Sequence, residues 1–223
     1  MMGRAVSAVT LLLVGATVLP SIVTVIVVGL VISNRPELPL IDGWWHSVML
    51  GFRHPVLDGL SHFLAVWGEK GLGFGVVPAI LVVVLVATRR SASVPGFLVA
   101  GVVSLIVVQS VKPLLGRARP EDIIVPSDAG SFPSGHVANV ATLGIFIALV
   151  YARVWVWALS AGYLVLMAFS RLYLHAHWLT DVLGGAVLGG AIGYAGYVLS
   201  TTPAAEALSA RLTRRLGRRL SLR

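Results

Sequence analysis

The chain has 223 residues, of which 57% are hydrophobic and only 12% are charged, with a formal net charge of +8 at pH 7. Soluble domains carry about twice that charged fraction, so a soluble fold is excluded. Cysteine is absent, which excludes thiolate catalysis and thiolate metal sites. The composition therefore predicts one all-α, polytopic membrane domain.

Six apolar runs approach or exceed the roughly 20 residues that a helix needs to cross a bilayer. Their solid apolar character, without alternation, disfavours a transmembrane barrel. The first run follows Arg4 as in a signal peptide, but its apolar core is about twice the usual length, so we interpret it as a retained span. The predicted spans are residues 8–33, 71–88, 95–115, 134–151, 153–172 and 178–200.

The segment between the first two runs, residues 36–71, is too polar to span the membrane cleanly. Its tryptophans, among them Trp44 and Trp67, are typical of the membrane–water interface. We therefore expect short interfacial or re-entrant helices here, broken at Pro55 and Gly68.

Three histidines of this segment, His46, His54 and His62, are spaced eight residues apart. A metal site would need a converging third ligand, which this spacing does not supply. Packing at the interface is the favoured interpretation, and no metal site is predicted.

Basic residues predict the orientation, because cytoplasmic loops are enriched in lysine and arginine. With the N-terminus inside, Arg4, Arg89, Arg90 and Arg153 fall on the cytoplasmic side, while nearly every carboxylate falls outside. We expect a transmembrane domain over residues 1–200. The basic tail, residues 201–223, is then cytoplasmic and lies near anionic headgroups instead of binding nucleic acid.

Three polar stretches interrupt the apolar chain at the predicted outer ends of the later spans, at residues 111–120, 131–136 and 170–181. Charged residues at membrane level are costly unless they reach the interface or serve a function. Their convergence on one side indicates an anionic ligand between them.

The first stretch, VKPLLGRARP, places Lys112 and Arg119 seven residues apart, so they share one face wherever the segment stays helical. A guanidinium fork and an ammonium point charge both suit phosphate oxygens. Arg117 is expected to face elsewhere and to contact headgroups. Simple snorkelling of all three cations is the alternative.

The second stretch, SFPSGH, has the features of a helix start. Ser131 and Ser134 are N-cap candidates, so the free N–H groups of the following helix would point at an anion. Gly135 permits close approach of a ligand to the backbone. His136 then lies in the first turn, beside that anion, although an interfacial histidine without function is the alternative.

The third stretch, SRLYLHAHWLTD, places Arg171 at the end of one span and His177 at the start of the next. Asp181 follows His177 by four residues and so lies on the same helical face. A carboxylate there can bind one imidazole nitrogen and leave the other as a nucleophile. His175 points differently and is expected to be a loop histidine.

Together, these motifs resemble the tripartite signature of the type 2 phosphatidic acid phosphatase and vanadium haloperoxidase superfamily, in its membrane lipid-phosphatase branch. The resemblance implies that His177 is the nucleophile, that Asp181 orients it and that His136 is the general acid. It implies no metal or cofactor. The residues that it assigns to phosphate binding are Lys112, Arg119, Ser134, Gly135 and Arg171.

A site at the outer interface of a chain without a sizeable soluble domain predicts a phosphorylated lipid as substrate. Within the family, polyprenyl diphosphates, phosphatidylglycerophosphate and phosphatidate are the candidates, and a bacterial plasma membrane is the expected location. A phosphotransferase of the same superfamily is the alternative. A transporter is disfavoured because the spans are nearly bare of polar residues at mid-depth, and a haloperoxidase because its soluble helical body is lacking.

Overall fold

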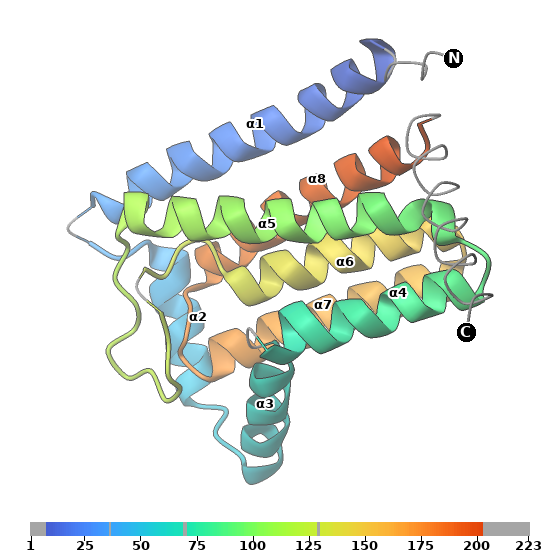
Figure 1. Ribbon diagram of the computed structural model, residues 1–223. Helices are drawn as coiled ribbons and strands as arrows, with labels where there is room; N and C mark the ends of the chain where they lie inside the picture. Colours follow the sequence, from blue (N-terminus) through green and yellow to red (C-terminus); the bar gives the residue numbers. More distant parts are fainter. Residues whose placement is uncertain (1–7, 36, 69–70, 129, 203–223) are drawn as a thin grey trace, which may run out of the picture.

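The computed structural model describes residues 8–35, 37–68, 71–128 and 130–202, and every regular element within these ranges is helical (Figure 1). The all-α prediction is therefore confirmed. The elements are α1 (Ala8–Ser33), α2 (Leu40–Leu50), α3 (Pro55–Gly68), a π-helical turn (Leu72–Val76) that runs into α4 (Val77–Ala87), a 3-10 turn (Ser91–Ser93), α5 (Val94–Leu115), α6 (Gly135–Tyr151), α7 (Val154–Tyr173) and α8 (Leu179–Ser200).

When the π-helical turn is counted with α4, the helix bounds differ from the predicted runs by at most one residue at each end. Four helices, α1, α5, α7 and α8, are long and apolar enough to span a bilayer, the α5 span being counted from the 3-10 turn before it. The pair α3 and α4, bent by 57° at their junction, would make a fifth span, whereas α6 has only 17 residues. Six spans therefore stay a prediction. Residues 1–7 and 203–223, which include Arg4 and most of the basic tail, lie outside the described residues.

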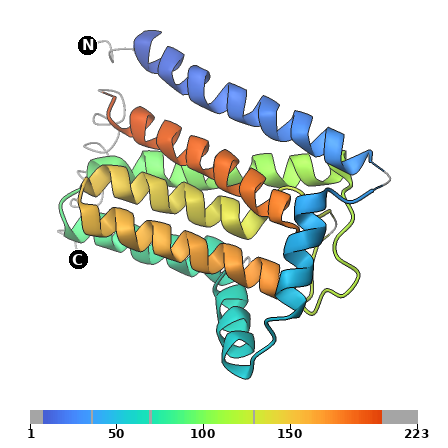
Figure 2. The same ribbon diagram turned by 180° about the vertical axis from the view of Figure 1, so that it is seen from behind.

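Two short helices precede the long hairpins, where the sequence predicted interfacial elements. Helix α3 begins at Pro55 and ends at Gly68, as predicted. Helix α2 lies across one end of the bundle, and α3 projects beside it (Figures 1 and 2). These two helices flank the end where α5 and α7 finish and α6 and α8 begin.

Helix α6 lies at the centre of the bundle and packs very closely against α8. A Cβ atom on Gly189 would lie 2.1 Å from the Ala138 carbonyl oxygen, and one on Gly193 would lie 2.4 Å from that of Thr142. Only glycine permits this backbone approach, which is typical of membrane helix pairs. The hydroxyl of Thr142 also donates to the Gly189 carbonyl at 3.0 Å. The contact fixes the middle of α8 against the N-terminal half of α6.

The outer faces of the bundle are apolar. Leu12 on α1, Ile106 on α5 and Leu159 on α7 are exposed. In water such a continuous apolar surface would drive aggregation, but in a bilayer it faces lipid tails. The polar residues are left at the ends of the helices, where the candidate site lies.

Candidate active site

A cavity of about 430 Å³ opens at the end of the bundle where α5, α6 and α7 meet. Its wall also includes Gly68, Gly71 and Phe74, and part of the loop between α5 and α6. Six of the eight site residues predicted from the sequence line it. They are Lys112, Arg119, Gly135, His136, Arg171 and His177.

The cations of the first motif meet on a carboxylate that the sequence analysis did not identify. The Lys112 Nζ donates to Asp128 Oδ1 at 3.0 Å, and Arg119 donates to the same oxygen at 2.7 Å. Burial alone would raise the pKa of Asp128, but the hydrogen bond from Lys112 and the charges of Lys112 and Arg119 hold it below its ordinary value. This part of the cavity is thus built to hold an anionic oxygen.

The two cations do not share a helical face, contrary to the simplest form of the prediction. Helix α5 continues through Pro113 and ends at Leu115, where Gly116 adopts a left-handed backbone with φ 57°. Gly116 supplies this conformation without a Cβ clash. Arg119 therefore lies on the loop after α5, and the turn of the chain at Gly116 brings its side chain back toward Lys112.

The imidazole of His177 is buried between two partners of opposite charge. Its Nδ1 lies 3.4 Å from Asp181 Oδ2, and its Nε2 lies 3.4 Å from Arg119 in the cavity wall. Burial lowers the pKa of His177 to about 4, against the opposing effect of Asp181. The ring is accordingly neutral near pH 7, with Nε2 on the cavity side.

Asp181 lies in the first turn of α8 and is completely buried. It accepts hydrogen bonds from the Trp178 backbone N–H at 2.8 Å, from the Ser131 hydroxyl and from Arg117. The His177–Asp181 pair is therefore held at the helix start, although His177 itself precedes the helix by two residues.

Arg117 was expected to contact headgroups, and this expectation is wrong. Its side chain is 5% exposed and bridges Asp181 to Asp42, with its other nitrogen 2.6 Å from Asp42 Oδ2. Asp42 also accepts a hydrogen bond from the Thr180 backbone N–H at 2.8 Å. Arg117 thus joins α2, the loop after α5 and the start of α8 through two fully buried carboxylates. These carboxylates are 75 and 64 residues away in the sequence, so local spacing could not indicate the contact.

The second motif begins α6 as predicted, with Ser134 as the N-cap residue. Its hydroxyl is buried and has no hydrogen-bond partner among the described residues. Gly135 lines the cavity next to His136. The His136 ring packs against Gly68, where an added Cβ would lie 2.2 Å from ring atom Cδ2. Ser131, the other N-cap candidate, instead binds Asp181.

The third motif contributes Arg171, which is buried at the end of α7 and lines the cavity. His175 lies in the turn between α7 and α8, is 3% exposed and has a left-handed backbone with φ 52°. It does not line the cavity. His175 therefore lies in a loop, as predicted, and its side chain makes its contacts outside the cavity.

A second, apolar cavity of about 500 Å³ lies between α4, α6 and α7. Val77, Leu81, Leu143 and Tyr163 are among the residues that line it, and Gly68 lines both cavities. A polar compartment thus adjoins an apolar one at a residue without a side chain.

Residues 94–203 match the PAP2 superfamily, a range that contains all three motifs. A protein from Sulfolobus acidocaldarius named undecaprenyl-diphosphatase is 29% identical over 154 residues, which cover 66% of this chain and 72% of that protein. The chain spans less than half of the length of three other curated relatives, which are named lipid A 1-phosphatase, lipid A 4'-phosphatase and phosphatidylglycerophosphatase B.

Two solved structures share the fold. The crystal structure of Aquifex aeolicus LpxE has a TM-score of 0.62 and 24% sequence identity, and the match covers 72% of this chain and 97% of that one. The first transmembrane PAP2-type phosphatidylglycerolphosphate phosphatase from Bacillus subtilis also gives 0.62, with 22% identity over 78% of this chain and 92% of that one. The family match gives the chain a PAP2 superfamily domain over residues 94–203. Its curated relatives are named phosphatases, which are hydrolases.

Proposed function

We propose that the protein hydrolyses a phosphomonoester or diphosphate of a membrane lipid through a phosphohistidine intermediate, at the extracytoplasmic face of the membrane. The observation that carries this proposal is the environment of His177. Its Nε2 lies in a cavity lined by Lys112, Arg119 and Arg171, while a buried carboxylate holds its Nδ1 side. A neutral imidazole aimed at a cationic cradle is suited to attack a bound phosphoryl group.

In the first step, His177 Nε2 attacks phosphorus, and the bond from phosphorus to the leaving oxygen breaks as the phosphorus–nitrogen bond forms. His136 gives its proton to that oxygen. Water then attacks phosphorus in the phosphohistidine, and the phosphorus–nitrogen bond breaks as the new phosphorus–oxygen bond forms. His136 takes up the water proton, phosphate leaves, and His177 is returned as the neutral imidazole. Asp181 stabilises the positive charge that develops on His177.

The cradle supports this chemistry by neutralising charge. The carboxylate of Asp128 forms ion pairs with Lys112 and Arg119, which supports the view that these two cations bind an anionic oxygen. A phosphate oxygen would take the place of Asp128 on the same donors. The free hydroxyl of Ser134 and the backbone of Gly135 at the start of α6 would then complete the cradle.

The pair of cavities supports a lipid as substrate. A headgroup in the polar cavity can leave its tail in the apolar cavity, because the two meet at Gly68. A soluble phosphoester would leave the apolar cavity unused. The lipids to test are polyprenyl diphosphates, phosphatidylglycerophosphate and phosphatidate.

The proposed orientation is supported by the distribution of charge along the bundle. The α4–α5 turn with Arg89 and Arg90, and Arg153 before α7, lie at the opposite end of the bundle from the cavity (Figure 1). Together with the arginines of residues 211–223, these three arginines favour a cytoplasmic position for that end under the positive-inside rule. Basic residues of the cavity end, such as Arg53, Lys112 and Arg117, are instead paired with carboxylates. The cavity would then face outward, on a bacterial plasma membrane, with both termini inside.

The test is phosphate release by the purified protein in detergent, with EDTA present, from each lipid of the panel. His136→Ala and His177→Ala are the active-site variants, and His62→Ala, an exposed histidine on α3, is the matched control. We expect release from at least one lipid, abolished by the first two variants and retained by the third. Folded protein that transfers the phosphoryl group to a lipid or sugar, and releases none to water, would contradict hydrolysis and favour the phosphotransferase.

A further inference from the structure

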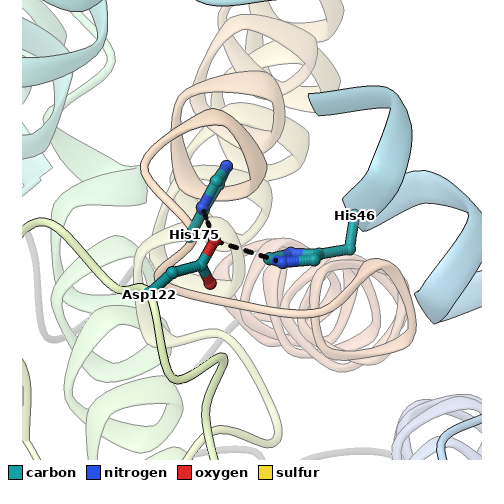
Figure 3. Close-up of side chains that lie close together, drawn as sticks. All are labelled: His46, Asp122 and His175. Carbon is teal, nitrogen blue, oxygen red and sulfur yellow. Dashed lines mark hydrogen bonds and ion pairs between the residues drawn. The ribbon is translucent and has the colours of Figure 1, made fainter. Parts of the chain in front are cut away.

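A second cluster of potential ligands lies outside the catalytic cavity. It consists of His46 on α2, Asp122 in the loop between α5 and α6, and His175 in the turn between α7 and α8 (Figure 3). None of the three lines the catalytic cavity. The sequence separates His46 and His175 so widely that their spacing gives no metal-site signal, and the fold supplies the converging ligands that the sequence analysis found lacking.

The three donor atoms already converge. Asp122 Oδ2 lies 2.5 Å from His175 Nδ1 and 3.3 Å from His46 Nε2, and all the ligand atoms lie within 4.8 Å of one another. Bonds of about 2.0–2.2 Å to a tetrahedral zinc ion need donors roughly 3.3 Å apart. Side-chain shifts of about an ångström would bring the three donors to that spacing.

The orientation of the side chains also suits a shared ion. Figure 3 shows both imidazoles turned toward the same carboxylate oxygen. The ring centroids of His46 and His175 are 4.7 Å apart and tilted by 58°, so the rings do not stack. The other side of His46 packs on the Trp178 ring at 5.3 Å. One face of the cluster stays open for a water as fourth ligand, since the Asp122 side chain is 41% exposed.

The backbone holds two of the ligands in place. His175 keeps a left-handed conformation that is uncommon for a residue other than glycine, and its N–H donates to the Leu172 carbonyl at 3.0 Å. The Ile124 N–H donates to the Leu174 carbonyl at 3.3 Å, which ties the Asp122 loop to the same turn. Strained positions that the surroundings maintain are concentrated at ligand sites.

We propose that His46, Asp122 and His175 bind one divalent transition ion of the zinc class. Two imidazoles with one carboxylate match the nitrogen and oxygen donors that zinc takes, whereas magnesium and calcium favour oxygen ligands. The ion fastens α2 and the α5–α6 loop to the turn that carries His177, two residues after His175. It is a structural ion, because the proposed reaction takes place in a cavity that these residues do not line.

The test is isothermal titration of ZnCl₂ into the chelator-treated full chain in detergent, with MgCl₂ as the parallel titrant. We expect one zinc per chain and a higher thermal unfolding temperature, with no comparable effect of magnesium. His46→Ala should weaken zinc binding by at least about 100-fold and remove the thermal shift, and His62→Ala on α3 should change neither. Asp122→Asn, at a more exposed position, repeats the test if His46→Ala fails to fold.

Absence of stoichiometric zinc binding would overturn the proposal, as would binding that survives His46→Ala or Asp122→Asn, or magnesium binding with equal affinity. These readouts do not depend on catalysis, so failure here is distinguishable from failure of the proposed phosphatase activity.

Discussion

The two sides of the catalytic cavity are built differently. On one side lies His177, the proposed nucleophile. It is backed by Asp181, which is fully buried and receives hydrogen bonds from Trp178, Ser131 and Arg117. On the phosphate side, the cations are held by Asp128, whose side chain is 35% exposed and lies on a loop. The carboxylate on the His177 side is thus buried and multiply hydrogen-bonded, whereas the one on the phosphate side is partly exposed and lies on a loop.

This difference matches what phosphoryl transfer requires. A nucleophile must hold its geometry before the substrate arrives, because misplacement of even an ångström is costly. A cationic cradle without an anion is unfavourable, so an internal carboxylate stabilises it until phosphate takes its place. Under the proposed function, His177 and Asp181 are the fixed groups and Asp128 is the exchangeable one.

The largest effect is expected for His177→Ala. Loss of the group that forms the covalent bond should lower kcat by at least about 100-fold, the scale seen for essential nucleophilic or acid–base groups. His175→Ala is not a suitable control, since it belongs to the proposed zinc site, so His54→Ala on the connection before α3 serves instead. Turnover by His177→Ala close to that of the parent would remove His177 from the mechanism.

A large effect on stability is expected for Arg117→Met. This change leaves Asp42 and Asp181 buried without their cation, a situation that costs about 3–5 kcal/mol. Chemical denaturation should show that loss, together with a lower kcat from the displaced Asp181. Arg53→Met is the control, because Arg53 pairs with Asp58 at a partly exposed position where such pairs contribute about 1 kcal/mol or less. Equal stability losses in the two variants would contradict the positioning role of Arg117.

A moderate effect is expected for Gly68→Val. The new side chain would collide with the His136 ring and narrow the junction of the two cavities. We expect kcat to fall by about 10-fold and KM for a long-chain lipid to rise, measured by phosphate release. Gly71→Ala is the control, since Gly71 also lines the polar cavity but has open space at its Cβ position. Wild-type kinetics for Gly68→Val would show that the two cavities act independently.

The smallest effect is expected for Asp128→Asn, and its sign is informative. Removing the carboxylate that competes for Lys112 and Arg119 should lower KM and strengthen inhibition by inorganic phosphate, each by about 3-fold. Asp58→Asn, on α3 away from the cavity, should change neither constant. A higher KM for Asp128→Asn would mean that this carboxylate positions the cations for the substrate and does not compete with it.

The sequence predicted the helices well because their boundaries follow from a strong local signal, namely long apolar runs ended by polar residues. Six of the eight residues that it singled out line one cavity, because the internal spacing of their motifs is short. It did not predict the role of Arg117 or Asp128, because their partners depend on how loops return to the bundle. The spacing of Gly185, Gly189 and Gly193 on α8 is a sequence signal for close helix packing that could have indicated the contact with α6.

The position of His46 illustrates the same limit. Read along α2, it has no converging ligand, and an interfacial role was the reasonable interpretation. Only the packing of α2 across the end of the bundle brings it to Asp122 and His175. Contacts of this kind are set by tertiary structure, which local spacing does not encode.

The central claim is that His177 accepts the phosphoryl group, and the most direct test is to trap it. The wild-type protein would be mixed with its best lipid substrate, quenched in alkali and digested, and the peptide around residue 177 examined by mass spectrometry. We predict an acid-labile, alkali-stable phosphoryl group on His177 that is absent from His177→Ala. Turnover with a phosphoryl group on another residue, or with none at all under conditions that preserve phosphohistidine, would contradict the account.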